Sequence, residues 1–505
     1  MIQGTMSGAG KSILTAGILR VLRQDGCRVV PFKSQNMALN SFVTRDGLEM
    51  GRAQVVQAAA AGMEPSADMN PILLKPMGDA SSQVIVNGRP IGKMRAADYY
   101  RVKKSFVPDI LAAYERLRQR ADIIVIEGAG SPVEINLREG DFVNMGLAEM
   151  VDAPVLLAGN IDPGGVFAQL LGTIQLLRPA ERARVKGLII NKFRGDVSLL
   201  QPGLAMFGEY CDIPFAGVVP WIRLDLDEED SMSEKLAGRS AGAGSAVDIA
   251  VIRLPYISNY TDFGPLERQP DVTVRYVSEA SSLGQPDLII LPGTKNTIGD
   301  LRWLRGSGME ARIREAAGTS LLLGICGGYQ MLGRMILDPL GSETGGSEEG
   351  LELLPIDTIF SADKHTMQKQ GITGKLPGVW APLSELPVSG YEIHMGRTEY
   401  LADPDKEISV FAKLTNGDPD GAVCGNVLGT YLHGLFDEAP LRSALLDLLR
   451  KRKGGACAVA GAAEALHTLS GLESARQMQD RQLDMLADVL RESLDWDLIY
   501  RAIGI

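Results

Sequence analysis

Short runs of aliphatic and β-branched residues alternate with helical stretches in the first two-fifths of the chain. The runs are Val29–Phe32, Ile123–Ile126, Pro154–Leu157 and Gly187–Ile190. Continuous apolar runs, unlike alternating ones, are typical of strands that helices cover on both faces. The pattern therefore predicts a parallel sheet in an α/β domain that continues to about Val219.

A second series of apolar runs follows a marked change in composition. Residues 225–247 are first acidic and then rich in Gly, Ala and Ser, which is typical of a linker between domains. The strands expected after it are Ile249–Ile252, Leu288–Leu291, Leu321–Leu323 and Leu428–Tyr431. The predicted organisation is a first domain over 1–224, a linker over 225–247, a second α/β domain over 248–445 and a helical tail over 446–505.

The tail carries one apolar stripe. Leu483, Leu486, Leu490 and Leu494 recur at helical spacing, so we expect this stripe to pack against another part of the protein. Residues 453–464 are rich in Gly and Ala and are expected to form a flexible segment at the surface.

Composition narrows the class of protein. A chain of 505 residues exceeds what one hydrophobic core usually supports, and 45% hydrophobic and 22% charged residues are ordinary for a globular enzyme. The net charge of −11 argues against nucleic acid as the main partner, although a local basic cleft for an anionic substrate stays compatible with it. No apolar run approaches the ~18 residues of a membrane span. Met1–Gln3 leads directly into a glycine loop, so no signal peptide is expected, and the five scattered cysteines indicate reduced thiols. We therefore expect a cytoplasmic protein.

The first candidate site is a phosphate-binding loop at the start of the chain, GTMSGAGKS from Gly4 to Ser12. In such loops backbone N–H groups at a helix start bind phosphate, the lysine reaches the outer phosphates and the hydroxyl holds Mg²⁺. The candidate nucleotide ligands are Gly8, Gly10, Lys11 and Ser12, with the helix expected over Ser12–Gln24. Gly4 lies one residue further back than the strict spacing requires. The strand before the loop is reduced to Met1–Gln3, which leaves open a very short strand or a start further upstream.

Polar residues at the ends of two other strands extend this site. Glu127 follows Ile123–Ile126 and is placed to bind Mg²⁺, with a helix-entry acid as the plainer alternative. Asn191 follows the strand at Gly187–Ile190 and is a candidate for reading the adenine, although asparagine in a loop is more often a turn former. Asp46 and Glu49 are further Mg²⁺ candidates that the sequence does not rank.

The second candidate site is a nucleophile elbow. Gly324-Ile325-Cys326-Gly327-Gly328 follows the strand at Leu321–Leu323 and opens a helical stretch. Small neighbours allow the strained turn that presents a nucleophile, and a helix N-terminus stabilises a thiolate. The pattern therefore favours a nucleophile at Cys326 over a small cysteine that only packs in the core. The cysteines without such a frame are Cys27, Cys211, Cys424 and Cys457.

A thiolate of this kind needs a base, and the chain has only four histidines. His433 directly follows a predicted strand, and His394 is a second candidate. His365 and His467 stand in polar or helical contexts, which favours structural or exposed positions. The residues by themselves leave the choice between His433 and His394 open.

These motifs resemble a known family. The long loop GT-x-S-x-x-GKS is similar to that of the dethiobiotin synthetase branch of P-loop enzymes, in which ATP converts a carboxylate to an acyl phosphate. Together with it, Pro31–Ser41, Glu127–Pro132 and Asp162–Ala168 resemble the cobyric acid synthase family, and the resemblance spans nearly the whole chain. Asn160 and Pro163 depart from the aspartate and arginine that are more usual there.

The resemblance implies a fold and a set of site residues. It implies a dethiobiotin synthetase-like P-loop domain with a parallel sheet, followed by a class I glutamine amidotransferase α/β domain. The run Tyr431–Phe436 is similar to the catalytic histidine motif of the latter, which selects His433 as the base. Leu435 stands where many members carry a glutamate, so Cys326 and His433 are expected to act as a dyad. The N–H groups of Gly293 and Gly327 are the implied oxyanion donors. The implied substrate-binding residues are Ser34, Gln35, Asn36 and Asn40, with Ser131–Leu137 as a further wall of the substrate pocket.

The implied activity is the amidation of the b, d, e and g carboxylates of adenosylcobyrinic acid a,c-diamide to give adenosylcobyric acid. ATP, Mg²⁺ and L-glutamine are the implied cofactors and co-substrate, acting through an acyl phosphate and channelled ammonia. One alternative is an amidotransferase similar to cobyrinic acid a,c-diamide synthase, against which the Ser34–Ser41 stretch argues. The other is a non-enzymatic, nucleotide-dependent scaffold, against which Cys326 and His433 argue. The order of the amidations and a homo-oligomeric state stay open.

Overall fold

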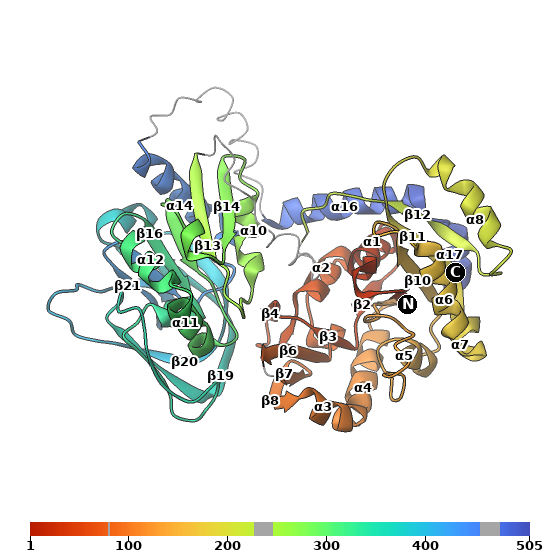
Figure 1. The fold of residues 1–505 in the computed structure, drawn as a ribbon, viewed down its shortest axis with the longest axis horizontal. Helices are drawn as coiled ribbons and strands as arrows, with labels where there is room; N and C mark the ends of the chain where they lie inside the picture. Colours follow the sequence, from red (N-terminus) through yellow and green to blue (C-terminus); the bar gives the residue numbers. More distant parts are fainter. Residues whose placement is uncertain (79–80, 227–245, 455–474) are drawn as a thin grey trace. The chain divides into compact units, whose positions relative to one another are not determined.

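The computed structural model describes residues 1–78, 81–226, 246–454 and 475–505 (Figure 1). The chain divides into two compact units. Unit 1 comprises Met1–Ala38, Glu49–Ser231 and Met478–Ile505, and unit 2 comprises Leu39–Leu48 and Met232–Gln477. Most of the linker expected over 225–247, most of the surface segment expected over 453–464, Cys457 and His467 lie outside the described residues.

The core of unit 1 is a parallel sheet. Its strands pair in the order β1-β10-β11-β12, and β2 pairs with β9. An isolated parallel bridge between Ile2 and Glu127 places β9 beside β1. The strands are β1 (Ile2–Gly4), β2 (Val29–Phe32), β9 (Ile123–Ile126), β10 (Val155–Asn160), β11 (Val185–Phe193) and β12 (Phe215–Pro220). The parallel sheet predicted from the apolar runs is therefore confirmed.

Helices and a smaller sheet complete unit 1. The smaller sheet has the order β3-β6-β7-β8. Its strands are β3 (Gln35–Met37), β6 (Ile72–Gly78), β7 (Ser81–Val86) and β8 (Arg89–Arg95), and β5 (Glu49–Gly51) precedes α2. The helices are α1 (Lys11–Gln24), α2 (Arg52–Ala61), α3 (Ala96–Val102), α4 (Val107–Arg118), α5 (Met145–Met150), α6 (Val166–Leu176), α7 (Pro179–Arg184), α8 (Gln201–Phe207), α16 (Ala475–Ser493) and α17 (Trp496–Ile503).

The C-terminal helices pack on unit 1. Helix α16 runs alongside α1 (Figure 1), and its Leu483, Leu486 and Leu490 are buried in one cluster with apolar side chains of α1. A Cβ on Gly17 of α1 would lie 2.3 Å from Leu490 Cδ1, so the two helices meet where α1 has no side chain. Arg20 adds ion pairs to two aspartates of α16 at 2.7 and 3.1 Å. The predicted apolar stripe is confirmed, and its partner is the helix that follows the phosphate loop.

Unit 2 is built on an eleven-stranded sheet. Its path is β14-β13-β15-β16-β23-β22-β21-β19-β17-β18, with β20 paired to β19. The first five strands of this path are parallel, and β22, β21 and β20 run antiparallel to their neighbours.

The elements of unit 2 follow in chain order. Its strands are β4 (Ser41–Val43), β13 (Val247–Ile252), β14 (Val272–Val277), β15 (Leu288–Leu291), β16 (Leu321–Ile325), β17 (Met335–Asp338), β18 (Gly346–Glu349), β19 (Ile356–Thr373), β20 (Pro387–Tyr400), β21 (Ser409–Leu414), β22 (Pro419–Cys424) and β23 (Val427–Thr430). Its helices are α10 (Gly264–Glu267), α11 (Thr297–Gly306), α12 (Met309–Ala316), α13 (Gly327–Met331) and α14 (Ala439–Arg452).

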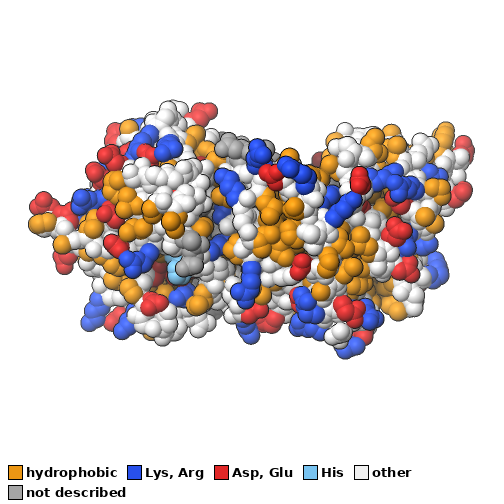
Figure 2. Space-filling model, turned by 90° about the horizontal axis from the view of Figure 1, so that it is seen from below, with side chains coloured by type: hydrophobic (Ala, Val, Ile, Leu, Met, Phe, Trp, Pro, Cys, Tyr) orange, Lys and Arg blue, Asp and Glu red, His pale blue; other side chains and the backbone are white. Residues whose placement is uncertain are grey.

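The surface carries charge of both signs. On the face shown in Figure 2, basic and acidic side chains are interspersed, with hydrophobic side chains exposed between them. Among the described residues, none of the helices combines the length and the hydrophobicity that a membrane span requires.

The packing of α16 on α1 yields a stability prediction. Leu490 is fully buried, so Leu490→Ala removes contacts and leaves a cavity, and we expect a loss of about 2–5 kcal/mol in the free energy of unfolding. Guanidinium unfolding followed by tryptophan fluorescence measures it. Leu199→Ala is the matched control, because that side chain is 82% exposed and its truncation should change little. Equal stability of the two variants would show that α16 does not contribute to the fold of unit 1.

Candidate active sites

The phosphate loop of unit 1 lies between β1 and α1. Gly10 has φ +80°, and a Cβ there would lie 2.3 Å from Nδ2 of Asn191, so only glycine fits. Asn191 Nδ2 donates to the carbonyl of Ala9 at 2.9 Å, and Asn160 Nδ2 donates to that of Gly8 at 3.1 Å. The two asparagines at the ends of β10 and β11 thus hold the loop backbone. Contact of Asn191 with an adenine stays a prediction.

Lys11 points into its own loop. Its ammonium donates to the carbonyls of Met6 and Ser7 at 2.9 and 3.2 Å, and to that of Gly130 at 3.2 Å. Gly130 belongs to the loop that follows β9. The ammonium therefore lies where the phosphate loop and the Glu127 loop meet, which is the position expected for a lysine that reaches phosphate.

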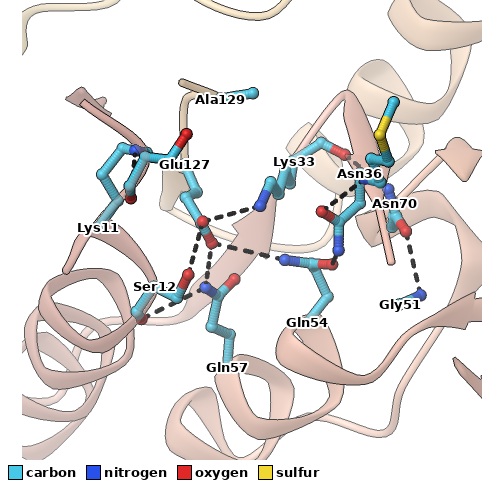
Figure 3. Close-up of polar contacts among 12 residues, drawn as sticks. Lys11, Ser12, Lys33, Asn36, Gly51, Gln54, Gln57, Asn70, Glu127 and Ala129 are labelled. Atoms are coloured by element: carbon cyan, nitrogen blue, oxygen red, sulfur yellow. Dashed lines mark hydrogen bonds and ion pairs between the residues drawn. The ribbon is translucent and has the colours of Figure 1, made fainter. Parts of the chain in front are cut away.

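Glu127 is the centre of a buried polar network (Figure 3). Its Oε1 accepts from Ser12 Oγ at 2.8 Å and from Lys33 Nζ at 2.9 Å, and its Oε2 accepts from Gln57 Nε2 at 2.5 Å. Burial raises the pKa of Glu127, but the Lys33 ammonium and the hydrogen bonds from Gln57 and Ser12 outweigh it and hold the pKa below its usual value. The carboxylate is therefore ionised at neutral pH.

The donors around Glu127 fit Mg²⁺. Ser12 Oγ and the carboxylate are adjacent, and Oε1 of Gln57 is buried without a hydrogen-bond partner among the described residues. Mg²⁺ takes oxygen ligands and usually keeps waters and substrate phosphates in its shell, so a few protein oxygens suffice. In the described part of the chain, no group of three or more His, Cys, Asp or Glu could hold a metal by itself.

The other Mg²⁺ candidates lie elsewhere. Glu49 pairs with Lys75 at 2.8 Å, and both side chains are buried. Asp46 accepts from the hydroxyl of Thr44 at 2.5 Å within unit 2. Neither residue is part of the network around Glu127.

The residues expected to bind substrate are engaged inside the protein. Ser34 Oγ donates to the carbonyl of Phe142 at 2.7 Å, and Gln35 Oε1 accepts from the hydroxyl of Tyr99 at 2.5 Å. Asn36 Nδ2 donates to Gln54 at 3.0 Å, and Gln54 reaches Glu127 at 3.5 Å (Figure 3). Asn40 belongs to unit 2, where its Oδ1 accepts the N–H of Tyr260 at 3.2 Å. Their contact with a substrate stays a prediction.

Lys33 is a site residue that the sequence reasoning did not single out. It follows β2 directly and faces Glu127, which follows the neighbouring strand β9. A lysine at the carboxyl end of a buried strand, beside a strand that ends in a carboxylate, is the signal that could have found it. It adds a second buried ammonium close to the phosphate loop.

Cys326 of unit 2 occupies a strained turn between β16 and α13. Its φ is 52° and its ψ is −108°, outside the regions that residues other than glycine usually adopt. A Cβ on Gly328 would lie 2.0 Å from the carbonyl oxygen of Leu291, and a Cβ on Gly327 would lie 2.6 Å from Thr294 Cγ2. Gly327 and Gly328 are therefore required to be small, because the elbow packs against the end of β15 and the loop that follows it.

Four adjacent parallel strands bring the thiol site together. The strands β13, β15, β16 and β23 are neighbours in the sheet. Gly293 follows β15, Cys326 follows β16, His433 follows β23, and Asp262 lies in the segment after β13. Because the carboxyl ends of parallel strands meet at one edge, this order gathers all four residues at one place.

His433 is fixed on several sides. Its Nδ1 lies 2.6 Å from Oδ2 of Asp262, and the ring stacks on Tyr391 with centroids 5.5 Å apart. A Cβ on Gly293 would lie 2.6 Å from His433 Cε1, so this glycine packs directly against the ring. The expectation from Leu435 that Cys326 and His433 act as a dyad stays a prediction. The carboxylate that lies at the ring is Asp262, from another part of the chain.

The charge on His433 follows from these contacts. Burial opposes the charged form, but the Asp262 carboxylate and Cys326 outweigh it and raise the pKa of His433 to about 10. The contacts of the charged His433 ring also stabilise the fold. Because the pKa of His433 in the folded state lies above the ordinary 6.5, this stabilisation is complete below pH 6.5 and is lost as the pH rises through about 10.

His394, the second candidate base, has other contacts. Its ring stacks on Tyr431 with centroids 3.8 Å apart, and its Nδ1 lies 2.7 Å from the carbonyl of Gly396. The neighbouring Ile393 carbonyl accepts from Cys326 Sγ at 3.6 Å, so β20 passes the thiol by its backbone. His365 stacks on His394 at 5.4 Å. The geometry favours His433 as the base.

The two expected oxyanion donors lie beside the thiol. Among the described residues no acceptor takes the N–H of Gly327 or of Gly293, whereas the Gly293 carbonyl accepts from the N–H of Ser258 at 2.8 Å. Backbone N–H groups next to a nucleophile can stabilise the oxyanion of a tetrahedral intermediate. The arrangement is suited to acyl transfer.

Comparison with known proteins agrees with a phosphate-binding site in unit 1 and a thiol site in unit 2. Residues 1–232 match the CobQ/CobB/MinD/ParA nucleotide binding domain, and residues 248–441 match the CobB/CobQ-like glutamine amidotransferase domain. The expected fold class, a P-loop domain followed by a glutamine amidotransferase domain, is thereby confirmed.

Full-length relatives are similar over both units. The chain is 52% identical to the cobyric acid synthase of Lachnoclostridium phytofermentans, over 99% of this chain and 98% of the relative. It is 52% identical to that of Ruminiclostridium cellulolyticum, over 100% and 96%, and 50% identical to that of Streptococcus sanguinis, over 100% and 98%. The resemblance seen in the motifs is confirmed along the whole chain.

The Glu127 network yields a second prediction. Glu127→Gln keeps the shape but removes the negative charge that faces the buried Lys33, and we expect a loss of roughly 3–5 kcal/mol in the free energy of unfolding. Adding Lys33→Met to this variant should restore part of the loss, because no charge then stays buried in the network. Guanidinium unfolding of both variants measures the coupling.

The same substitution at an exposed glutamate shows how much of the loss in Glu127→Gln comes from the burial of its ion pair. Glu115→Gln removes the carboxylate of an exposed pair with Arg118 and should leave the unfolding midpoint nearly unchanged. If Glu127→Gln behaves like Glu115→Gln, the Lys33–Glu127 pair does not hold the site together.

Proposed function

The chain belongs to the cobyric acid synthase family, and we propose that it converts carboxylates of a corrinoid to primary amides, with ATP as the activating agent and glutamine as the nitrogen donor. The substrate we propose is adenosylcobyrinic acid a,c-diamide, amidated at its b, d, e and g carboxylates to adenosylcobyric acid. The observation that carries the proposal is about 50% identity to relatives named cobyric acid synthase over both units of the chain.

Unit 2 would release ammonia from glutamine. The Cys326 thiolate attacks the side-chain amide carbon, and the N–H groups of Gly327 and Gly293 receive the developing oxyanion. Protonated His433 gives its Nε2 proton to the departing nitrogen, and ammonia leaves. Water then hydrolyses the thioester to glutamate, with His433 accepting a proton from it. What supports these roles is their placement at four neighbouring strand ends.

Unit 1 would activate the corrinoid carboxylate. The phosphate loop with Gly8, Gly10 and Lys11 binds the triphosphate of ATP, and Lys33 brings further positive charge beside it. Ser12 and Glu127 would hold Mg²⁺, which supplies charge neutralisation at the phosphates. The carboxylate oxygen takes up the γ-phosphoryl group to form an acyl phosphate, and ADP leaves. Unprotonated ammonia then displaces phosphate from the acyl carbon and loses one proton, which gives the primary amide. The buried Glu127 carboxylate, which accepts from Lys33 and from the hydroxyl of Ser12, supports this assignment.

The proposal predicts separable activities. In Cys326→Ala the glutamine-dependent amidation should be abolished, whereas amidation with added ammonium salt should persist, because the variant lacks only the nucleophile that releases ammonia. Mass spectrometry of adenosylcobyrinic acid a,c-diamide incubated with protein, ATP and Mg²⁺ would resolve up to four carboxylate-to-amide steps.

Two further variants define the outcome. Cys424→Ala should behave like the wild type, and Lys11→Ala should lose amidation from both nitrogen sources. No mass shift of the corrinoid in the wild-type protein with either source would contradict the proposed substrate. Undiminished glutamine-dependent activity in Cys326→Ala would contradict the proposed nucleophile.

The packing of Gly293 on His433 predicts a strong effect of one methyl group. In Gly293→Ala the added carbon would lie 2.6 Å from His433 Cε1, well inside the usual 3.5–4.0 Å carbon contact, so the imidazole must shift by about 1 Å. A displacement of this size can lower the rate about 10²-fold, and we expect that loss in glutaminase kcat.

A second glycine in the same region provides the comparison. Gly306→Ala at the end of α11 meets no atom within 4 Å and should leave glutamine hydrolysis unchanged. Release of glutamate from glutamine measures both variants. A fully active Gly293→Ala would mean that His433 is not held against this glycine.

A further inference from the structure

Both carboxylate oxygens of Asp262 are committed to the segment that carries the proposed base. Oδ2 lies 2.6 Å from His433 Nδ1, and Oδ1 accepts the N–H of Gly434 at 3.0 Å. The side chains of His433 and Asp262 are only 1% and 3% exposed. A carboxylate that binds a ring nitrogen and the next backbone N–H at once leaves the imidazole a single orientation.

The turn that delivers Asp262 is itself anchored. Asp262 lies in a short 3₁₀ helix, Tyr260–Phe263, and its N–H donates to the carbonyl of Asn259 at 3.0 Å. Asn259 has φ +52°, and its Oδ1 accepts the N–H of Ser41 at 3.1 Å. Asn40 accepts the N–H of Tyr260 at 3.2 Å. Residues 40 and 41 thus hold this turn from a segment that belongs to unit 2.

We propose that Asp262 is the positioning carboxylate of the glutaminase site. It keeps the proton of His433 on Nδ1 and leaves Nε2 to exchange protons with Cys326 and with the departing nitrogen. Leu435, at the place where related amidotransferase domains carry a glutamate, is buried and apolar and offers no such partner. The inference rests on the proposed glutaminase function of unit 2.

The proton inventory is consistent with this role. The thiol proton of Cys326 moves to Nε2, which leaves a thiolate and an imidazolium. The imidazolium is stabilised by Asp262 on its Nδ1 side, and Asp262 stays ionised throughout. The Nε2 proton later moves to the leaving nitrogen as its bond to carbon breaks. Asp262 therefore acts only through His433 and never touches the substrate.

The other groups around His433 do not compete for this role. The Tyr391 ring stacks on the imidazole, but its hydroxyl donates to the Ser41 carbonyl at 3.2 Å. Cys326 faces the ring from the elbow, and Asp437 lies on the side of Gly434. Among the described titratable groups, only Asp262 lies at hydrogen-bonding distance from Nδ1.

Asparagine at position 262 tests the proposal sharply. The N–H of Gly434 requires an acceptor, so the amide oxygen of the variant should stay with Gly434 and its NH₂ group should face His433 Nδ1. A donor at that place forces Nδ1 to accept, which moves the ring proton to Nε2 and prevents the ring from taking the thiol proton. Asp262→Asn should therefore be inactive because of a wrong tautomer and not because of a wrong shape.

The experiment measures three properties of full-length Asp262→Asn. Glutaminase kcat should fall about 10⁴-fold, the scale observed when the aspartate of a Ser-His-Asp triad becomes asparagine. Alkylation of Cys326 by iodoacetamide at neutral pH should slow, because loss of the carboxylate lowers the pKa of His433 and with it the share of imidazolium–thiolate pairs. Amidation with ammonium salt should stay within about twofold, since Asp262 has no part in the chemistry of unit 1.

Asp338→Asn provides the matched control. Asp338 is a buried aspartate of unit 2 that accepts three backbone N–H groups and does not touch His433. Its substitution should leave the alkylation rate of Cys326 and its pH dependence unchanged, even where stability falls. Equal effects of the two substitutions on alkylation would overturn the positioning role.

A measurement on the wild-type protein reads the tautomer of His433 without any substitution at Asp262. With ¹⁵N-labelled histidine the four histidines give a sparse spectrum, and His433 is assigned by its loss in His433→Gln. We expect a proton on Nδ1 at neutral pH and also above the pKa of the ring. A neutral ring with its proton on Nε2 would overturn the inference. Failure of the wild type to hydrolyse glutamine would instead contradict the proposed function and leave the tautomer result standing.

Discussion

The arrangement of unit 2 depends on the backbone of Cys326 being held at φ 52° and ψ −108°. Such a conformation costs about 1–3 kcal/mol for a residue with a side chain, so the surroundings must impose it. The N–H of Cys326 donates to the Thr430 carbonyl at 2.8 Å, and its own carbonyl accepts from Gln330 at 3.0 Å. Gly328 approaches the carbonyl oxygen of Leu291 so closely that no side chain fits. Strand β23 thus fixes the elbow through Thr430, and the chain reaches His433 three residues later, so nucleophile and base are set by one pair of strands.

Both units use the same consequence of parallel pairing. In unit 1 the phosphate loop follows β1, Lys33 follows β2 and Glu127 follows β9, and these strands are neighbours. In unit 2 the thiol site collects residues from four neighbouring strands. This is why the candidate sites could be predicted from apolar runs and the polar residues directly after them. The strands at Val29–Phe32, Ile123–Ile126 and Leu288–Leu291 coincide with β2, β9 and β15, and Cys326 and His433 lie at adjacent strand ends as expected.

Other features could not be predicted because their cause is not local. Asp262 is 171 residues from His433, and a short turn with one aspartate has no distinctive pattern. The expectation drawn from Leu435 did not include Asp262, since a missing carboxylate next to the histidine does not show whether another segment places one at the ring. The substrate-binding role of the Ser34–Ser41 stretch was implied by the family resemblance and stays a prediction. Ser34 and Asn36 are buried and hydrogen-bonded within the protein, which the sequence pattern did not indicate. The helical spacing in the tail predicted the stripe but could not name α1 as its partner.

The two sites share one electrostatic device. Glu127 with Lys33, and Asp262 with His433, are cation–carboxylate pairs removed from water. Burying each ion costs several kcal/mol, which the attraction between the partners must offset before a pair adds any stability, so a buried pair is weak evidence for stability. A buried pair fixes the orientation of its side chains, because the hydrogen bonds between the partners are not exchanged with water. In unit 1 this aims a carboxylate at the serine of the phosphate loop, and in unit 2 it aims an imidazole at a thiol. Reactions that place new charge on phosphate oxygens and on the oxyanion of a tetrahedral intermediate need such groups in place before the substrate arrives, because rearranging them during the reaction would add to its barrier.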